Sequence, residues 1–155
     1  MGRRRNAIYL QEASIVERGQ DDDHFSLTDR SALGHLRREI RDDFDRVGAD
    51  PSLVFECLVS VTEACTNALK HGQSDAESGD HDPQVTWTIE PESALFTVRD
   101  FSARRWSDRR KPIDLTQPAA GGYGIELMRK LMDEVSIEID SEGTTVILTK
   151  RLPPT

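Results

Sequence analysis

Residues 54–71 read VFECLVSVTEACTNALKH, and in this stretch an apolar helical face coincides with chemically capable polar side chains. Glu63, Asn67 and His71 follow one another at four-residue intervals and project together from one side of a helix. The apolar and small residues recur at helical spacing on another side: Val54, Cys57, Leu58, Val61, Cys65, Ala68 and Leu69. The pattern predicts a central helix with its apolar face in the core and a polar face available for chemistry.

The residues around this stretch mark the expected ends of the helix. Asp50 is the expected N-cap, and Pro51 suits the first helical position, where a backbone N–H has no helical partner. Gly72 follows His71 and predicts that the helix ends there. Residues 72–83 are polar, acidic and rich in turn formers, so they are expected to form a surface loop.

The rest of the chain alternates between strand and helix patterns. Strands are expected at 7–16, 25–27, 84–89, 94–100, 135–139 and 144–151. Further helices are expected at 29–47 and 125–132. The helix at 29–47 has a densely charged outer face that includes Arg37 and Arg38. The hairpin formed by 84–89 and 94–100 places Asp100 at its far end.

Composition limits the classes of function. At 155 residues and 36% hydrophobic content, the chain is expected to form one domain. A net charge of −8 argues against a general nucleic-acid binder, which neutralises phosphates. No apolar run approaching the roughly 20 residues of a membrane span is recognised, and no signal peptide, so a cytoplasmic protein is expected. Cys57 and Cys65 are too far apart on one helix for a disulfide and are expected to be reduced core residues.

A glycine-rich turn precedes the helix at 125–132. The residues Gly121, Gly122, Tyr123 and Gly124 place backbone amides at a helix N-terminus, where unpartnered N–H groups and the helix dipole favour phosphate. A Walker-type loop is excluded because no Lys-Ser or Lys-Thr pair follows. On the central helix, Asn67 offers a neutral oxygen suited to magnesium, and Glu63 can accept a proton.

These motifs resemble those of a known family. EACTNALKHG, at 63–72, resembles the N-box of the GHKL superfamily of histidine-kinase-like ATPases, in the version found in bacterial anti-sigma factor serine/threonine-protein kinases. GYG at 122–124 and GTTV at 143–146 are similar to that family's later motifs. The resemblance covers 25–151, leaving 1–24 and 152–155 as tails. It implies a two-layer α/β (α+β) sandwich, in which a mostly antiparallel mixed sheet is covered on one face by about three helices, with a Bergerat-type ATP site.

The resemblance also implies roles for particular residues. Glu63 would be the catalytic base, and Asn67 the magnesium ligand. Residues that would contact ATP are Asn67, Lys70, His71, Asp100, Gly122, Tyr123, Gly124 and Thr145. The implied partners are a sigma factor, which regulates transcription, and a STAS-type anti-anti-sigma protein that is phosphorylated on serine or threonine. Arg37 and Arg38 would contribute to docking, and a homodimer is expected.

Three alternatives stay open from the sequence. Ser102 stands where the family has a glycine beside the adenine site, which favours a non-catalytic ATP-binding module that switches partners. The basic segment from Arg104 to Lys111 around Trp106, read here as the ATP lid, would serve a nucleic-acid-binding domain as a stacking and phosphate patch. A histidine-kinase catalytic domain is the third, although the chain has no room for a dimerisation helix pair.

Overall fold

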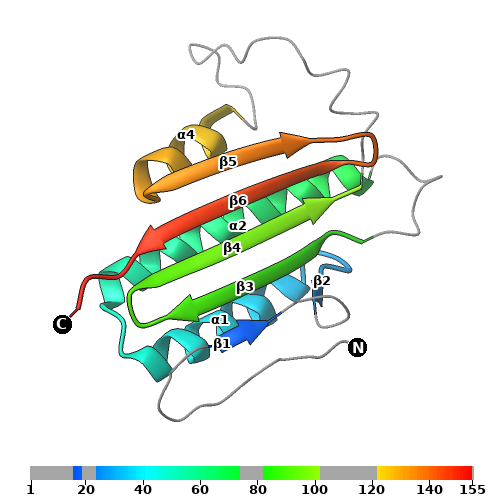
Figure 1. Cartoon of the computed structure of the whole chain (residues 1–155). Coiled ribbons are helices and arrows are strands. Elements are labelled where there is room, and N and C mark those ends of the chain that lie inside the picture. The colour runs from blue at the N-terminus through cyan, green and yellow to red at the C-terminus, as the bar shows by residue number, and fades with distance from the viewer. Residues whose placement is uncertain (1–15, 19–23, 74–81, 102–121, 155) are drawn as a thin grey trace, which may run out of the picture.

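The computed structural model describes residues 16–18, 24–73, 82–101 and 122–154. Its strands are β1 (Val16–Arg18), β2 (Phe25–Ser26), β3 (Gln84–Glu90), β4 (Ser93–Asp100), β5 (Glu134–Ile139) and β6 (Thr144–Arg151). Its helices are α1 (Ala32–Val47), α2 (Pro51–Gln73) and α4 (Gly122–Leu131). Figure 1 shows the long diagonal strands lying in front of α2.

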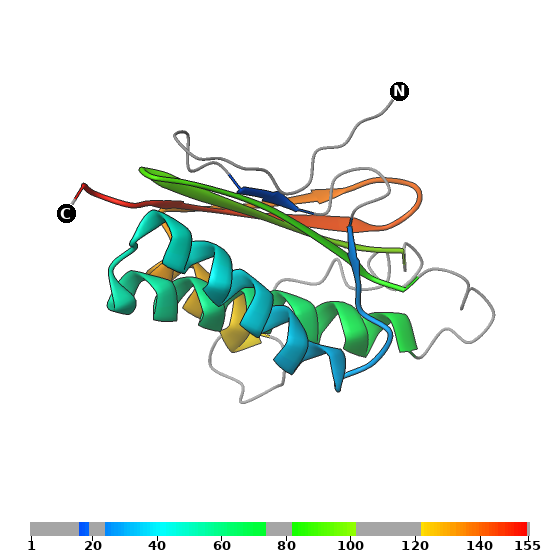
Figure 2. The same ribbon diagram turned by 90° about the horizontal axis from the view of Figure 1, so that it is seen from below.

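The strands form one sheet in the order β1-β3-β4-β6-β5, with β2 pairing separately with β3. Every pairing between described strands is antiparallel. Figure 2 shows the three described helices together on one face of this sheet. The predicted two-layer sandwich is therefore confirmed, and the described strands contribute no parallel pair to it.

The core lies between the sheet and its helices. The strands bury every second residue and α2 buries residues at helical spacing, as expected from the sequence. On β3 and β4 every second side chain is buried, including Trp87 and Phe96. All seven apolar or small residues expected on the inner face of α2 are buried. Phe44 of α1 packs on Phe96 with ring centroids 6.1 Å apart, which joins the two layers. Full burial of one such side chain stabilises the fold by roughly 1.5–3 kcal/mol.

The boundary between α1 and α2 follows the predicted chemistry. Gly48 ends α1 with a positive φ of 68°, and its N–H is donated to the carbonyls of Asp45 and Phe44. The Asp50 carboxylate accepts hydrogen bonds from the backbone N–H and the hydroxyl of Ser52, at 2.8 and 2.7 Å. These contacts satisfy groups that a helix end leaves without partners.

Three predicted boundaries were wrong. Helix α1 begins at Ala32 instead of residue 29, because residues 29–31 form a turn in which the Asp29 carboxylate accepts the N–H of Ser31. Helix α2 continues through Gly72 to Gln73, because a glycine costs a helix only about 1 kcal/mol and does not by itself stop it. Helix α4 begins at Gly122 instead of residue 125, so Gly122, Tyr123 and Gly124 form its first turn. The strand expected at 7–16 lies outside the described residues except for Val16, where β1 begins.

The composition of α2 reflects its central position. By length and composition, Pro51–Lys70 would be apolar enough to cross a membrane, contrary to the expectation from the sequence. A core helix passes the same test, and most apolar residues of this segment are buried, although Phe55 is 66% exposed. Leu152, assigned above to the C-terminal tail, is also buried, and its N–H is donated to the Glu92 carbonyl at 2.9 Å.

Candidate active site

A small pocket lies between α2, α4 and the sheet. Its walls are mostly apolar, and three polar side chains, those of Asn67, Asp100 and Thr144, converge on it. The other lining residues are Ala64, Ala68, Val98, Ile125, Met128, Ile137 and Val146. The volume is about 20 Å³, which is room for roughly one water molecule. An apolar pocket with a few convergent polar groups is typical of a small-molecule site.

Asp100 and Thr144 form the polar end of this pocket. They are direct cross-strand partners on β4 and β6, so their side chains lie on the same face of the sheet. Asp100 is 5% exposed and Thr144 is 1% exposed. Among the described residues, the Thr144 hydroxyl has no hydrogen-bond partner. A buried polar atom without a partner costs about 1–3 kcal/mol, so this hydroxyl points to a bound group that would satisfy it.

Gly143 permits this close pairing. A Cβ at Gly143 would lie 1.9 Å from the carbonyl oxygen of Asp100 and 2.8 Å from the Cα of Phe101. Both atoms belong to the backbone, so no side-chain movement can make room. A glycine here lets the start of β6 approach the end of β4, which places Thr144 beside Asp100.

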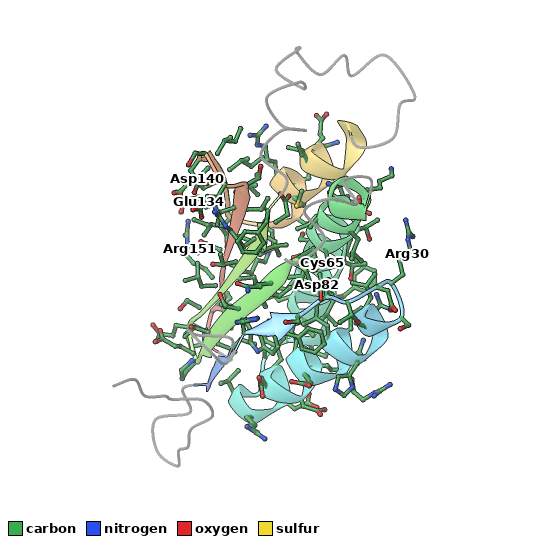
Figure 3. All side chains as sticks on the ribbon, turned by 90° about the vertical axis from the view of Figure 1, so that its right-hand side faces the viewer. Arg30, Cys65, Asp82, Glu134, Asp140 and Arg151 are labelled. Atoms are coloured by element: carbon green, nitrogen blue, oxygen red, sulfur yellow. The ribbon has the colours of Figure 1, made fainter. Side chains whose placement is uncertain are left out.

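Arg99 stabilises the turn at 140–143, which leads into β6, from the other side of the sheet. Its guanidinium donates to both carboxylate oxygens of Asp140, at 2.9 and 3.1 Å, and to the Thr145 hydroxyl at 2.8 Å. Figure 3 shows Asp140 on the side of the sheet away from the helices. The hydrogen bond from Arg99, followed by that from the Glu142 N–H, lowers the pKa of Asp140 to about 2. The turn at 140–143 is therefore braced by a charged contact.

At the other end of the site, α4 begins against the polar face of α2. A Cβ at Gly124 would lie 2.7 Å from Oε1 of Glu63 and 3.4 Å from Nδ2 of Asn67. The first turn of α4, whose backbone N–H groups have no helical partners, therefore lies directly beside this carboxylate and amide. Two motifs about 60 residues apart in the chain meet here.

Asn67 connects the two ends, because it lines the pocket and also lies beside Gly124. Among the described residues, no group of three or more His, Cys, Asp or Glu side chains is placed to hold a metal ion. One neutral amide oxygen instead suits a magnesium ion that takes its remaining ligands from phosphate groups and water. This donor set fits the magnesium implied by the sequence motifs.

Thr145 does not line the pocket, although it was named as a candidate ligand. It lies on the opposite face of the sheet and accepts the hydrogen bond from Arg99. Thr144, which does line the pocket, is a candidate residue that sequence reasoning missed. The signal was available in the strand alternation, because the side chains at 144, 146 and 148 share one face with Asp100 once β4 and β6 are paired.

The remaining candidate residues lie at the edge of the site or beyond it. Lys70 is exposed on α2. Arg38 is exposed on α1, whereas Arg37 is half-buried and donates to the Thr62 hydroxyl at 3.4 Å. The side chains of His71 and Tyr123 lie outside the described residues, as do Ser102 and the basic segment 104–111.

The two cysteines play no part in the site. Both are free and buried, and Figure 3 shows Cys65 between the helices and the sheet. Burial raises the pKa of the Cys57 thiol to about 12 and also raises the pKa of Cys65. Both thiols are therefore protonated and unreactive at neutral pH, as expected for reduced core residues.

Comparisons with known proteins indicate the family of the chain. Residues 25–150 match a family model described as a histidine kinase-like ATPase domain. The chain is 34% identical over 110 residues to the anti-sigma F factor of Bacillus licheniformis, a match that covers 66% of this chain and 74% of that protein. It is 30% identical over 129 residues to the serine-protein kinase RsbW of Bacillus pumilus, covering 77% of this chain and 78% of that protein.

A solved structure shares the fold. The crystal structure of the RsbU and RsbW domains of Rv1364c from Mycobacterium tuberculosis matches with a TM-score of 0.60 at 21% identity. The match covers 90% of this chain and 33% of that longer chain. At this level of identity the likeness establishes the arrangement of helices and strands alone.

Proposed function

Because this chain belongs to the histidine kinase-like ATPases and, within them, to the anti-sigma factor kinases, we propose that it binds ATP with magnesium and phosphorylates a partner protein. The proposed acceptor is a serine or threonine of an anti-anti-sigma protein, and the protein regulated in turn is a sigma factor. The observation that carries the proposal is the contact of Gly124 with both Glu63 and Asn67, beside a pocket that contains Asp100 and Thr144.

The two ends of the site suit the two ends of a nucleotide. Asp100 can accept a hydrogen bond from an exocyclic amino group, and the unpartnered Thr144 hydroxyl can donate to a ring nitrogen. Because the pocket holds roughly one water, a base would bind at its mouth. The first-turn amides of α4 would bind phosphate oxygens, and Asn67 would hold magnesium.

Glu63 is the proposed catalytic base. In the transfer step, the acceptor hydroxyl oxygen forms a bond to the γ-phosphorus while the bond from that phosphorus to the bridging oxygen breaks. Glu63 accepts the hydroxyl proton, and ADP leaves. A positioned base of this kind contributes about 10² to 10⁴ in rate. Magnesium, when bound, neutralises the charge of the phosphates.

A transfer assay with radiolabelled ATP and a cognate anti-anti-sigma protein tests this function. The unmutated protein is expected to label its partner, and Glu63→Gln to reduce labelling by about 10² to 10⁴ while ATP affinity stays within a few-fold. Full transfer by Glu63→Gln would refute the base assignment. Tight ATP binding without any transfer by the unmutated protein would favour the non-catalytic module.

We also propose that the protein acts as a homodimer and works in the cytoplasm.

We propose further that partners dock on the outer face of α1. The exposed guanidinium of Arg38 supports the docking surface, whereas Arg37 is already engaged with Thr62. Arg38→Ala is expected to weaken partner binding and to leave ATP binding unchanged. Equal partner affinity in a pull-down titration would contradict that placement.

A further inference from the structure

Lys150 is a buried lysine that joins three elements of the fold. The residue belongs to β6 and is 8% exposed. Its ammonium lies 2.7 Å from Oε1 of Glu56 on α2, and it donates a hydrogen bond to the carbonyl of Leu131 at 2.5 Å. Leu131 is the last residue of α4, where helix carbonyls lack partners and a positive charge is favourable.

The Lys150 contact and the active-site contact are separated by the same distance along α2 as along α4. Helices α2 and α4 run in opposite directions, and they meet at Glu63 with Gly124 and again at Glu56 with Leu131 through Lys150. Seven positions separate Glu56 from Glu63, and seven also separate Gly124 from Leu131. At 1.5 Å per residue each interval is about 10 Å. The two contacts therefore fix α4 against α2 at both ends.

The apolar contacts between these helices at the pocket are adaptable. Toward the pocket, α4 presents Ile125 and Met128, and α2 presents Ala64 and Ala68. Methionine is flexible and adapts to irregular gaps, and alanine offers a flat surface, so such a contact tolerates sliding. A shift of α4 along its axis would draw the Leu131 carbonyl away from the Lys150 ammonium and leave that buried charge with fewer partners, which is costly.

We propose that Lys150, paired with Glu56, is a positioning residue that sets α4 along α2 and thereby aims the first-turn amides of α4 at the nucleotide phosphates. This role rests on the ATP binding proposed above. The adenine end of the site is built differently, because Asp100 and Thr144 belong to β4 and β6. Although α4 also contributes Ile125 and Met128 to the pocket wall, the polar groups that would bind the base belong to the sheet, so loss of the positioning pair should weaken phosphate binding far more than base binding.

The experiment compares ATP and adenosine as ligands of the full chain carrying Lys150→Met. Methionine fills a similar volume, but removal of one partner of a buried ion pair destabilises a fold, so thermal unfolding first establishes that Lys150→Met is folded. The affinity for ATP, measured by calorimetry, is expected to fall about tenfold. The affinity for adenosine, measured by chemical-shift titration, is expected to stay within about twofold. Lys130→Met, on the exposed side of α4, is the matched control and should change neither affinity.

Glu56→Gln provides a second variant that removes one charge and leaves Lys150 able to bond to Leu131. It is expected to lower ATP affinity less than Lys150→Met and to spare adenosine, and it carries the test if Lys150→Met does not fold. Unchanged ATP affinity in both folded variants, or equal losses for ATP and adenosine, would overturn the positioning role while the proposed function stands. Failure of the unmutated protein to bind ATP would overturn the proposed function and this role with it.

Discussion

Thr144 and Thr145 are adjacent on β6, yet they have opposite relations to the site. The Thr144 hydroxyl is buried beside Asp100 with no partner among the described residues, whereas Thr145 bonds to Arg99 on the other face of the sheet. The first hydroxyl destabilises the fold unless something binds it, and the second supports the turn at 140–143. At the residue scale, Thr144 is thus distinguished from Thr145 by a missing hydrogen-bond partner among the described residues, a property that the buried Ser60 hydroxyl of α2 shares away from the pocket.

Thr144→Val should separate ligand binding from stability. Valine has a similar shape and removes the unpartnered hydroxyl, so the free energy of unfolding without nucleotide is expected to stay equal or rise. ATP affinity should fall several-fold, equivalent to about 1 kcal/mol for one hydrogen bond. Urea unfolding and calorimetry measure the two effects. Thr145→Val is the matched control, and a larger loss of ATP affinity in that variant would contradict the assignment.

At the scale of elements, the site depends on close approaches between backbones. The first turn of α4 can lie against Glu63 and Asn67 because Gly124 has no side chain, and β6 can meet the end of β4 because Gly143 has none. The two glycines differ in what a methyl group would meet. At Gly143 it would meet a rigid backbone, whereas at Gly124 it would meet the flexible end of Glu63.

Gly124→Ala should therefore impair catalysis more than folding. The added Cβ would displace the Glu63 carboxylate, and a misplacement of about 1 Å can reduce a rate by about 10². Stability should not fall, since alanine favours a helix over glycine by roughly 0.5–1 kcal/mol. Gly34→Ala, in α1 with nothing within 4 Å, is the control for stability and should raise it by a similar amount. Thermal unfolding and the transfer assay are the measurements, and equal transfer rates in Gly124→Ala and the unmutated protein would refute the placement of Glu63.

At the scale of the whole molecule, much of the architecture was predictable because it depends on periodicity. The period of two predicted the buried faces of β3 and β4, and helical spacing predicted the inner face of α2. Spacing also predicted that Glu63 and Asn67 share a side, and the glycines at 122–124 predicted a helix start nearby.

The parts that could not be predicted depend on how distant elements lie in space. The pairing of β6 with β4 decides that the Thr144 side chain lies on the same face of the sheet as Asp100. The proposed role of Lys150 depends on the position of α4 along α2. Local signals also misplaced the end of α2 at Gly72, because packing along its length outweighs the cost of one glycine.

The acid stability of the fold should depend on Asp140. Its pKa is lowered from 3.8 to about 2, mainly by Arg99, so its contribution to stability is fully present above about pH 4 and is lost as the pH falls toward 2. Asp140→Asn should be less stable than the unmutated protein at pH 6, and the difference should shrink between pH 4 and pH 2. Urea unfolding at pH 6, 4 and 2.5 measures this difference. If the difference in the free energy of unfolding between the two proteins does not change with pH, the ion pair between Arg99 and Asp140 is contradicted.

The central claim, that α2, α4 and the sheet together form a site for ATP with magnesium, is tested most directly by an ATP titration in a calorimeter. Runs with magnesium and with a chelator compare the unmutated protein with Asn67→Ala. The account predicts saturable binding of one ATP per chain, tightened by magnesium in the unmutated protein and much less so in Asn67→Ala. Equal affinity with and without magnesium would remove that role from Asn67. No heat and no thermal shift at millimolar ATP, in a protein shown to be folded, would contradict the account as a whole.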